Sequence, residues 1–185
     1  MAYTNLSASG PGSRLIASSP ATSEASLDPG NRAFQAVTDF TRICPITVFP
    51  DCSIEHALER MIGLGVHALL VTERWNDGSQ RQVLGLITSC DIRHREERQH
   101  RAAAALRHPA KAVCVREVMT PWCDLPLIHY ESLLDLTVRE LQDRLEGTGL
   151  THFLVVESEG GERESARGLI SRASIAQRLR RPPSA

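Results

Sequence analysis

The chain contains two copies of one sequence pattern, and this internal repeat restricts its fold more than any other feature. Helix caps, glycine stops and strand residues recur at one offset through most of the copy. After a turn late in the copy, this offset is one residue shorter. The matched pairs are Ser53 with Thr137, Gly65 with Gly149, Leu70 with Leu154, Gly85 with Gly168, and Thr88 with Ser171. Such a repeat predicts two structural units of the same kind.

Each copy predicts the order strand, helix, strand, strand, helix, which is an α/β (α+β) unit. Strand-forming apolar runs indicate the strands, and apolar residues at helical spacing indicate the helices. In the first copy we expect strands at 46–48, 66–72 and 82–88, with helices at 53–64 and from 89 onward. In the second copy we expect strands at 125–128, 153–156 and 167–171, a helix starting at the Thr137–Glu140 capping box, and a last helix that includes Leu179.

The repeat and the composition around it predict the domain boundaries. The first 31 residues are rich in Ser, Ala, Gly and Pro without periodicity, which is typical of a flexible tail. The arm that follows carries Phe34, Val37 and Phe40 at helical spacing, and we expect it to pack onto the body. The expected divisions are a tail 1–31, a first domain with its arm 32–98, a linker 99–114, a second domain 115–181 and a tail 182–185.

The composition excludes several classes of protein. The formal net charge of -1 argues against a dedicated nucleic-acid binder, which usually has a basic excess. No apolar run is long enough to span a membrane, and no signal peptide is visible. The five cysteines lack CxxC spacing, which favours a reduced, cytoplasmic protein. We find no set of catalytic or metal-ligating residues with a recognised spacing, so we expect neither an enzyme nor a metal site.

The most informative single stretch runs from Gly85 to Ile92. Its apolar residues indicate the end of a buried strand, and Thr88 or Ser89 can cap the helix that follows. Asp91 then lies in the first turn of this helix, where free N–H groups can also hold a phosphate. A hydroxyl and a carboxylate at this spacing can bind the phosphate and the ribose of a nucleotide. The same spacing also makes a capping pair that needs no ligand, so both interpretations stay open.

The repeat and two of its motifs resemble the tandem cystathionine-β-synthase (CBS) domain pair, or Bateman module. The motifs are Gly85-Leu-Ile-Thr-x-x-Asp91 and Val118-Met119-Thr120-Pro121. The resemblance covers about residues 43–179 and implies two β-α-β-β-α units, each with a three-stranded sheet, packed through their sheets as a pseudo-twofold pair. In this family the clefts between the units often bind AMP, ADP, ATP or S-adenosylmethionine. Most members regulate another protein and catalyse nothing.

The resemblance also implies where a ligand would bind. Matched by position, the nucleotide-binding residues are Thr88, Asp91, Ile46, Thr47, His67, Ala68 and Arg93. The second copy has Ser171 for the hydroxyl but Ser174 in place of the carboxylate, so we expect at most one competent site. The expected function is a regulatory module that binds an adenosine nucleotide as a ligand and not as an obligatory cofactor, forms a homodimer and acts on an unidentified partner protein. The alternative is a ligand-free dimerisation scaffold whose clefts are filled by its own side chains.

Overall fold

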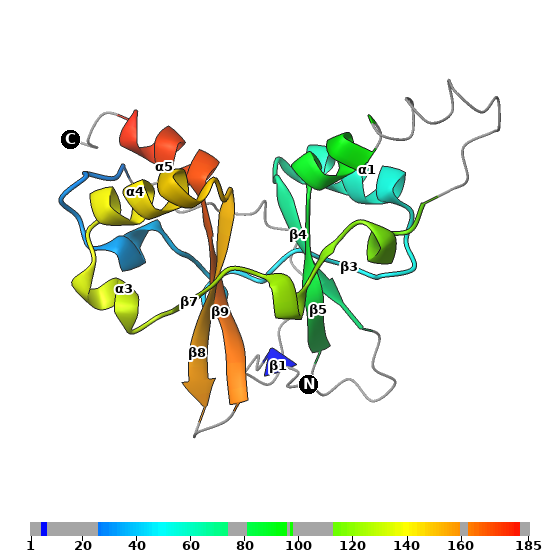
Figure 1. The fold of residues 1–185 in the computed structure, drawn as a ribbon, viewed down its shortest axis with the longest axis horizontal. Coiled ribbons are helices and arrows are strands. Elements are labelled where there is room, and N and C mark those ends of the chain that lie inside the picture. The colour runs from blue at the N-terminus through cyan, green and yellow to red at the C-terminus, as the bar shows by residue number, and fades with distance from the viewer. Residues whose placement is uncertain are drawn as a thin grey trace. The chain divides into compact units, whose positions relative to one another are not determined.

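The structure, a computed structural model, describes residues 5–6, 26–73, 81–95, 97, 113–159 and 163–181. The chain forms two compact units (Figure 1). Unit 1 combines residues Met1–Cys44 with Pro126–Ala185, and unit 2 consists of Pro45–Leu125. Each unit is a mixed α/β structure built around its own sheet, as the sequence predicted.

Unit 2 contains the main body of the first copy. Its strands are β3 (Thr47–Val48), β4 (Ala68–Thr72), β5 (Arg81–Thr88) and β6 (Thr120–Pro121), and they lie in the order β3-β4-β5-β6. β3 runs parallel to β4, and the other neighbours are antiparallel. The helical segments are α1 (Ile54–Leu64), the helix after β5 that covers residues 89–95, and the 3-10 turns η2 (Val115–Glu117) and η3 (Trp122–Asp124). Its core is aliphatic, with Met61, Leu69 and Ile87 almost fully buried.

Unit 1 contains the main body of the second copy. Its sheet has the order β2-β9-β8-β7, formed by β2 (Thr38–Asp39), β9 (Arg163–Ser171), β8 (His152–Glu159) and β7 (Leu127–His129). Its helical segments are η1 (Ala33–Ala36), α3 (Ser132–Asp135), α4 (Val138–Thr148) and α5 (Arg172–Leu179). A two-residue strand, β1 (Asn5–Leu6), lies near the start of the chain. Leu133, Leu141 and Leu145 are fully buried in this core.

The helix boundaries follow from caps that the sequence predicted. Ser53 Oγ accepts a hydrogen bond from His56 N at 3.2 Å at the start of α1. Gly65 ends that helix with a φ of 64°, a left-handed conformation that favours glycine. In α4, Thr137 and Glu140 form a reciprocal capping box, and Gly149 ends the helix with a φ of 68°. The two copies therefore share their helix signals as well as their strand order.

The segment that precedes each copy pairs with the sheet of the other copy. β2 lies before the first copy in the chain but pairs with β9 of the second, so that Thr38 faces Leu169. β6 lies before the second copy but pairs with β5 of the first, so that Leu86 faces Thr120. The expectation of three strands per sheet was therefore incomplete, because β2 joins the sheet of unit 1 and β6 joins the sheet of unit 2.

The arm before the first copy packs as predicted but has a different conformation. Phe34 and Val37 have helical spacing in the sequence but do not lie on one α-helix, because the arm is a 3-10 turn, η1, followed by β2. Val37 is buried, while Phe34 remains 37% exposed. The ordered packing also begins earlier than residue 32, since Leu27 is buried and its N–H donates to Arg178 O at 3.1 Å. Residues 99–112 of the predicted linker 99–114 lie outside the described residues.

Candidate functional site

The strand register of unit 2 brings most of the predicted site residues to one end of the sheet. Ala68, the first residue of β4, faces Thr88, the last residue of β5. Thr47 in β3 faces Leu70, and Leu70 N donates to Ile46 O at 3.0 Å. The start of β3, the start of β4 and the end of β5 therefore lie at the same end of the sheet.

His67 lies at the same end of the sheet, and its backbone carbonyl is hydrogen-bonded to the protein. Its carbonyl oxygen accepts from Ser89 N at 3.0 Å, which holds the start of the helix after β5 against the start of β4. His67 as a whole is an exposed residue. The backbone carbonyls of His67 and Ile46 thus each accept one hydrogen bond from the protein, which leaves one lone pair on each oxygen.

Thr88 and Asp91 form a closed capping box at the junction of β5 with the following helix. Asp91 Oδ2 accepts from Thr88 N at 2.8 Å and from Thr88 Oγ1 at 2.7 Å, and Asp91 N donates to Thr88 Oγ1 at 3.2 Å. Thr88 is 7% exposed, and Asp91 is half-buried. The Asp91 carboxylate, which the sequence suggested as a ribose ligand, therefore accepts hydrogen bonds at the start of its own helix.

The box leaves acceptor capacity on the carboxylate. A carboxylate has about four lone-pair positions, and both Thr88 donors use the same oxygen, Oδ2. Within the described residues, no hydrogen bond reaches Asp91 Oδ1. Arg93 is exposed, and its Nε donates to Ser89 O at 3.4 Å along its own helix, so it does not pair with Asp91. The arrangement is compatible with capping alone and with an additional donor at Oδ1.

The second copy has the cap without the acid. Ser171 Oγ accepts from Ser174 N at 3.5 Å at the start of α5, and the first turn of that helix has no acidic residue. Ser174 therefore supplies only a hydroxyl where the first copy supplies a carboxylate. This difference fits the expectation from sequence that the two copies are not equivalent.

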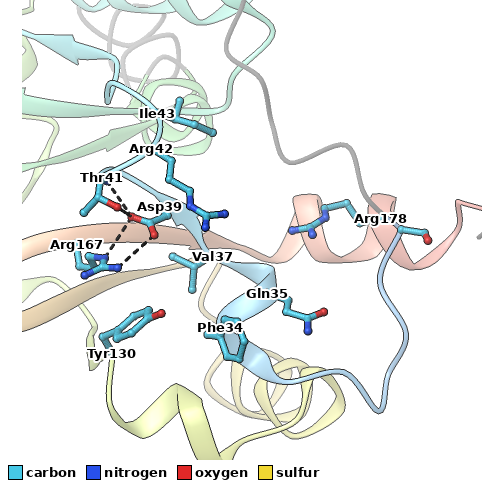
Figure 2. A pocket seen from close by; sticks show the side chains of 11 residues that line it. Phe34, Gln35, Val37, Asp39, Thr41, Arg42, Ile43, Tyr130, Arg167 and Arg178 are labelled. Atoms are coloured by element: carbon cyan, nitrogen blue, oxygen red, sulfur yellow. Dashed lines mark hydrogen bonds and ion pairs between the residues drawn. The ribbon is translucent and has the colours of Figure 1, made fainter. Parts of the chain in front are cut away.

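A separate cavity of about 520 Å³ lies in unit 1 (Figure 2), and sequence reasoning did not find it. Its wall combines the segment before the first copy with the turn after β7, with β9 and with α5. The residues that give it its chemical character are Phe34, Asp39, Arg42, Tyr130, Arg167 and Arg178. These residues are far apart in the chain and share no local pattern.

An ionic network holds one side of this cavity. Arg167 Nε lies 3.2 Å from Asp39 Oδ1, and Arg167 Nη1 lies 2.8 Å from Glu157 Oε2. The same guanidinium lies 4.6 Å from the centre of the Tyr130 ring, a cation–π distance. Burial raises the pKa of Asp39, but hydrogen bonds from Thr41 and Arg167 outweigh it and lower the pKa below its ordinary value. The network fastens β2 to β9.

The described residues contain no group of three or more His, Cys, Asp or Glu side chains placed to hold a metal ion. Cys90 and His94 do approach each other, with Sγ 3.8 Å from Nε2, but no third ligand joins them in this part of the chain. None of the helices in the described ranges is both long and apolar enough to cross a membrane.

Comparison with known proteins finds a family match for one part of the chain. Residues 37–97 match the family model of the CBS domain, and this range contains every predicted site residue. The search of curated proteins found no match.

Solved structures share the fold over most of the chain. An uncharacterised conserved protein from Pyrococcus horikoshii is 19% identical with a TM-score of 0.56, over 86% of this chain and 99% of that one. A CBS-domain-containing protein from Agrobacterium tumefaciens is 22% identical with a TM-score of 0.51, over 82% and 96% of the two chains. CBSX2, solved in complex with AMP, is 17% identical with a TM-score of 0.51, over 80% and 95%.

Proposed function

We propose that this chain, which carries a CBS domain and has the fold of paired CBS-domain proteins, is a regulatory module that senses an adenosine nucleotide and acts on a partner protein. The observation that carries the proposal is the meeting of Ile46, Thr47, Ala68 and Thr88 at one edge of the unit 2 sheet, with Asp91 directly beside them. All of them lie within the range that matches the family model. The AMP bound by CBSX2 supports the choice of ligand class.

Asp91 is the residue that would recognise the ribose. Its other oxygen, Oδ1, accepts no hydrogen bond from a described residue and can accept from one ribose hydroxyl while Oδ2 keeps its bonds to Thr88. The carboxylate has about four acceptor positions, so a second ribose hydroxyl can donate to a remaining lone pair without displacing the buried Thr88 hydroxyl. Binding therefore does not require the box to open, and the negative charge strengthens each new hydrogen bond.

The regulatory effect would come from a preference of the ligand for one arrangement of the protein. A ligand shifts an equilibrium only by the difference between its affinities for the two states. The nucleotide acts here as a signal and not as an obligatory cofactor, and we assign no catalytic role to any residue.

The second candidate is a ligand-free dimerisation scaffold, and the closed Thr88–Asp91 box favours it. A capping box satisfies both residues without any ligand. On α1, Ile62 is 72% exposed and Leu64 is 37% exposed, and an apolar helix end of this kind suits contact with a second copy of the chain. A homodimer is compatible with both candidates, so ligand binding is what separates them.

A thermal-shift screen tests the proposal. AMP, ADP, ATP and S-adenosylmethionine are added to the protein, with GMP and inorganic phosphate as controls for the base and for the anion. At a concentration near 100 times its Kd, a ligand stabilises the folded state by about 2.7 kcal/mol. For a chain of this size that corresponds to a rise in Tm of roughly 5–11 °C. The absence of a shift with every adenosine compound would reject the sensor and favour the scaffold.

A further inference from the structure

The two units contain equivalent helices, α1 and α4 (Figure 1), whose outward surfaces differ. Both helices have 11 residues, begin at a side-chain cap and end at a glycine with positive φ. Each packs on its own core through three buried residues at matching positions, which are Ile54, Ala57 and Met61 in α1 and Val138, Leu141 and Leu145 in α4. The core-facing sides are therefore alike, and the fold does not require the outward sides to differ.

One outward face of α1 is apolar where the same face of α4 is polar. Leu58 and Ile62 are four residues apart, so they lie on one side of α1. Leu58 is partly buried, while Ile62 is 72% exposed and is the most exposed large apolar residue in the described part of the chain. The equivalent pair in α4 is Gln142 and Glu146, joined by a hydrogen bond of 2.9 Å from Nε2 to Oε1. A polar pair is what a solvent-facing helix surface ordinarily carries.

Two carboxylates lie on the same face as the apolar pair. Glu55 and Glu59 are four residues apart on α1. Together with Leu58 and Ile62 they have the i, i+3, i+4, i+7 spacing of a single helix face. Both glutamates are exposed, and no ion pair joins either one to another residue in the described ranges. The face contains no Lys or Arg, whereas α4 has Arg139 at the position of Glu55.

These charges distinguish between the molecules that could cover the face. A second copy of the chain would present the same face across a two-fold interface. Because the face carries carboxylates and no cation, pairing it with itself would bury acidic side chains without an opposite charge. A basic amphipathic helix fits better, since it brings apolar side chains to Leu58 and Ile62 and Lys or Arg side chains to the glutamates.

We propose that the face of α1 formed by Glu55, Leu58, Glu59 and Ile62 is the docking surface for a basic amphipathic helix of a partner protein. The assignment rests on the proposed function only in taking a partner protein to exist, and it does not need a bound nucleotide. α1 belongs to unit 2, the unit that also contains the candidate nucleotide site. Partner docking and ligand sensing would therefore belong to the same unit.

Fluorescence anisotropy with the full chain tests this surface. The probe is a labelled helical peptide with leucine on one face and lysine on the other, and the control peptide has glutamate in place of lysine. The lysine peptide is expected to bind at least about tenfold more tightly than the glutamate peptide. Ile62→Gln removes the apolar contact and Glu59→Lys reverses one charge, so each is expected to weaken binding of the lysine peptide by about tenfold.

Matched variants in unit 1 make the result specific. Asp143→Lys makes the same charge reversal at the position of α4 that corresponds to Glu59, and Leu134→Gln removes another exposed apolar side chain. Both variants are expected to bind the lysine peptide as the wild type does. All four substitutions are at exposed residues, so the fold should be retained. Light scattering without peptide should give the same mass for the wild type and Ile62→Gln.

Four outcomes would each overturn the inference. They are no binding of the lysine peptide to the wild type, equal binding of the two peptides, equal weakening by Glu59→Lys and Asp143→Lys, and a wild-type dimer that Ile62→Gln converts to a monomer. The last outcome would place a second copy of the chain on this face. Because no nucleotide is present, a negative thermal-shift screen would reject the sensor without changing any of these results.

Discussion

Replacing Gly168 by alanine tests the pairing of β2, which precedes the first copy, with β9 of the second copy. A Cβ at this position would lie 2.5 Å from Val37 Cγ1 and 2.7 Å from the backbone oxygen of Thr38. Ordinary contacts of a Cβ begin at 3.4 Å, and the backbone of β2 cannot rotate away as a side chain can. The methyl group would therefore push β2 outward from β9 by several tenths of an ångström. The glycine is needed for this close approach and not for an unusual backbone angle.

The expected cost follows from two opposing effects. Forcing an extra methyl group into a packed site usually costs about 1–3 kcal/mol. Removing a glycine from a strand interior returns about 0.5–1 kcal/mol through the lower entropy of the unfolded chain. We therefore expect Gly168→Ala to lower the free energy of unfolding by about 1–2 kcal/mol. For a chain of this size the Tm should fall by roughly 2–8 °C.

Thermal and urea unfolding of the wild type and two variants provide the measurement. Gly147→Ala is the matched control, because a Cβ on this glycine of α4 would meet nothing within 4 Å. Alanine there should stabilise the protein by up to about 1 kcal/mol. If Gly168→Ala were as stable as the wild type while the control behaved as expected, β2 would not pack against β9 as described.

Two more predictions concern the caps and the ionic network. Thr137→Ala should lower the free energy of unfolding by about 1 kcal/mol in urea titrations, because it removes the acceptor for Glu140 N; an unchanged midpoint would show that this cap is not formed in solution. The pKa of Asp39 is lowered in the folded state, so its contribution to stability is present above its ordinary pKa of 3.8 and is lost as the pH falls through the lower folded value. The wild type should therefore lose stability below about pH 4 more steeply than Asp39→Asn, and parallel pH profiles would contradict the pairing with Arg167.

Local signals were enough to predict most elements of the fold. The cap at Ser53, the box at Thr137 and the glycine stops are encoded within a few residues, so they can be recognised without tertiary information. β2 and β6 could not be predicted in this way, since two residues carry no periodicity. A trace of both strands in the sequence is a glycine in the strand that each one joins, Gly85 or Gly168, where a side chain would collide with the neighbour.

The sequence was enough to predict where the candidate site lies but not whether its carboxylate caps a helix or binds a ligand. The sequence placed Thr88 and Asp91 at a strand-to-helix junction, and the structure has them there. Spacing alone cannot distinguish a carboxylate that caps a helix from one that binds a ligand, because both uses need the same residues in the same turn. The arginines of the unit 1 cavity were missed for another reason: Arg42 and Arg178 come together only through the fold.

The effect of Asp91→Asn on nucleotide affinity tests the central claim most directly. Asparagine keeps the shape and one acceptor of Asp91 but removes the charge, and Ser174→Ala changes the equivalent position of the second copy. Calorimetry with AMP or ATP should show a loss of roughly 10–100-fold for Asp91→Asn, as expected when hydrogen bonds to a charged group are weakened, and little change for Ser174→Ala. Equal affinities for the wild type and both variants would contradict the assignment of Asp91 as the ribose-binding residue.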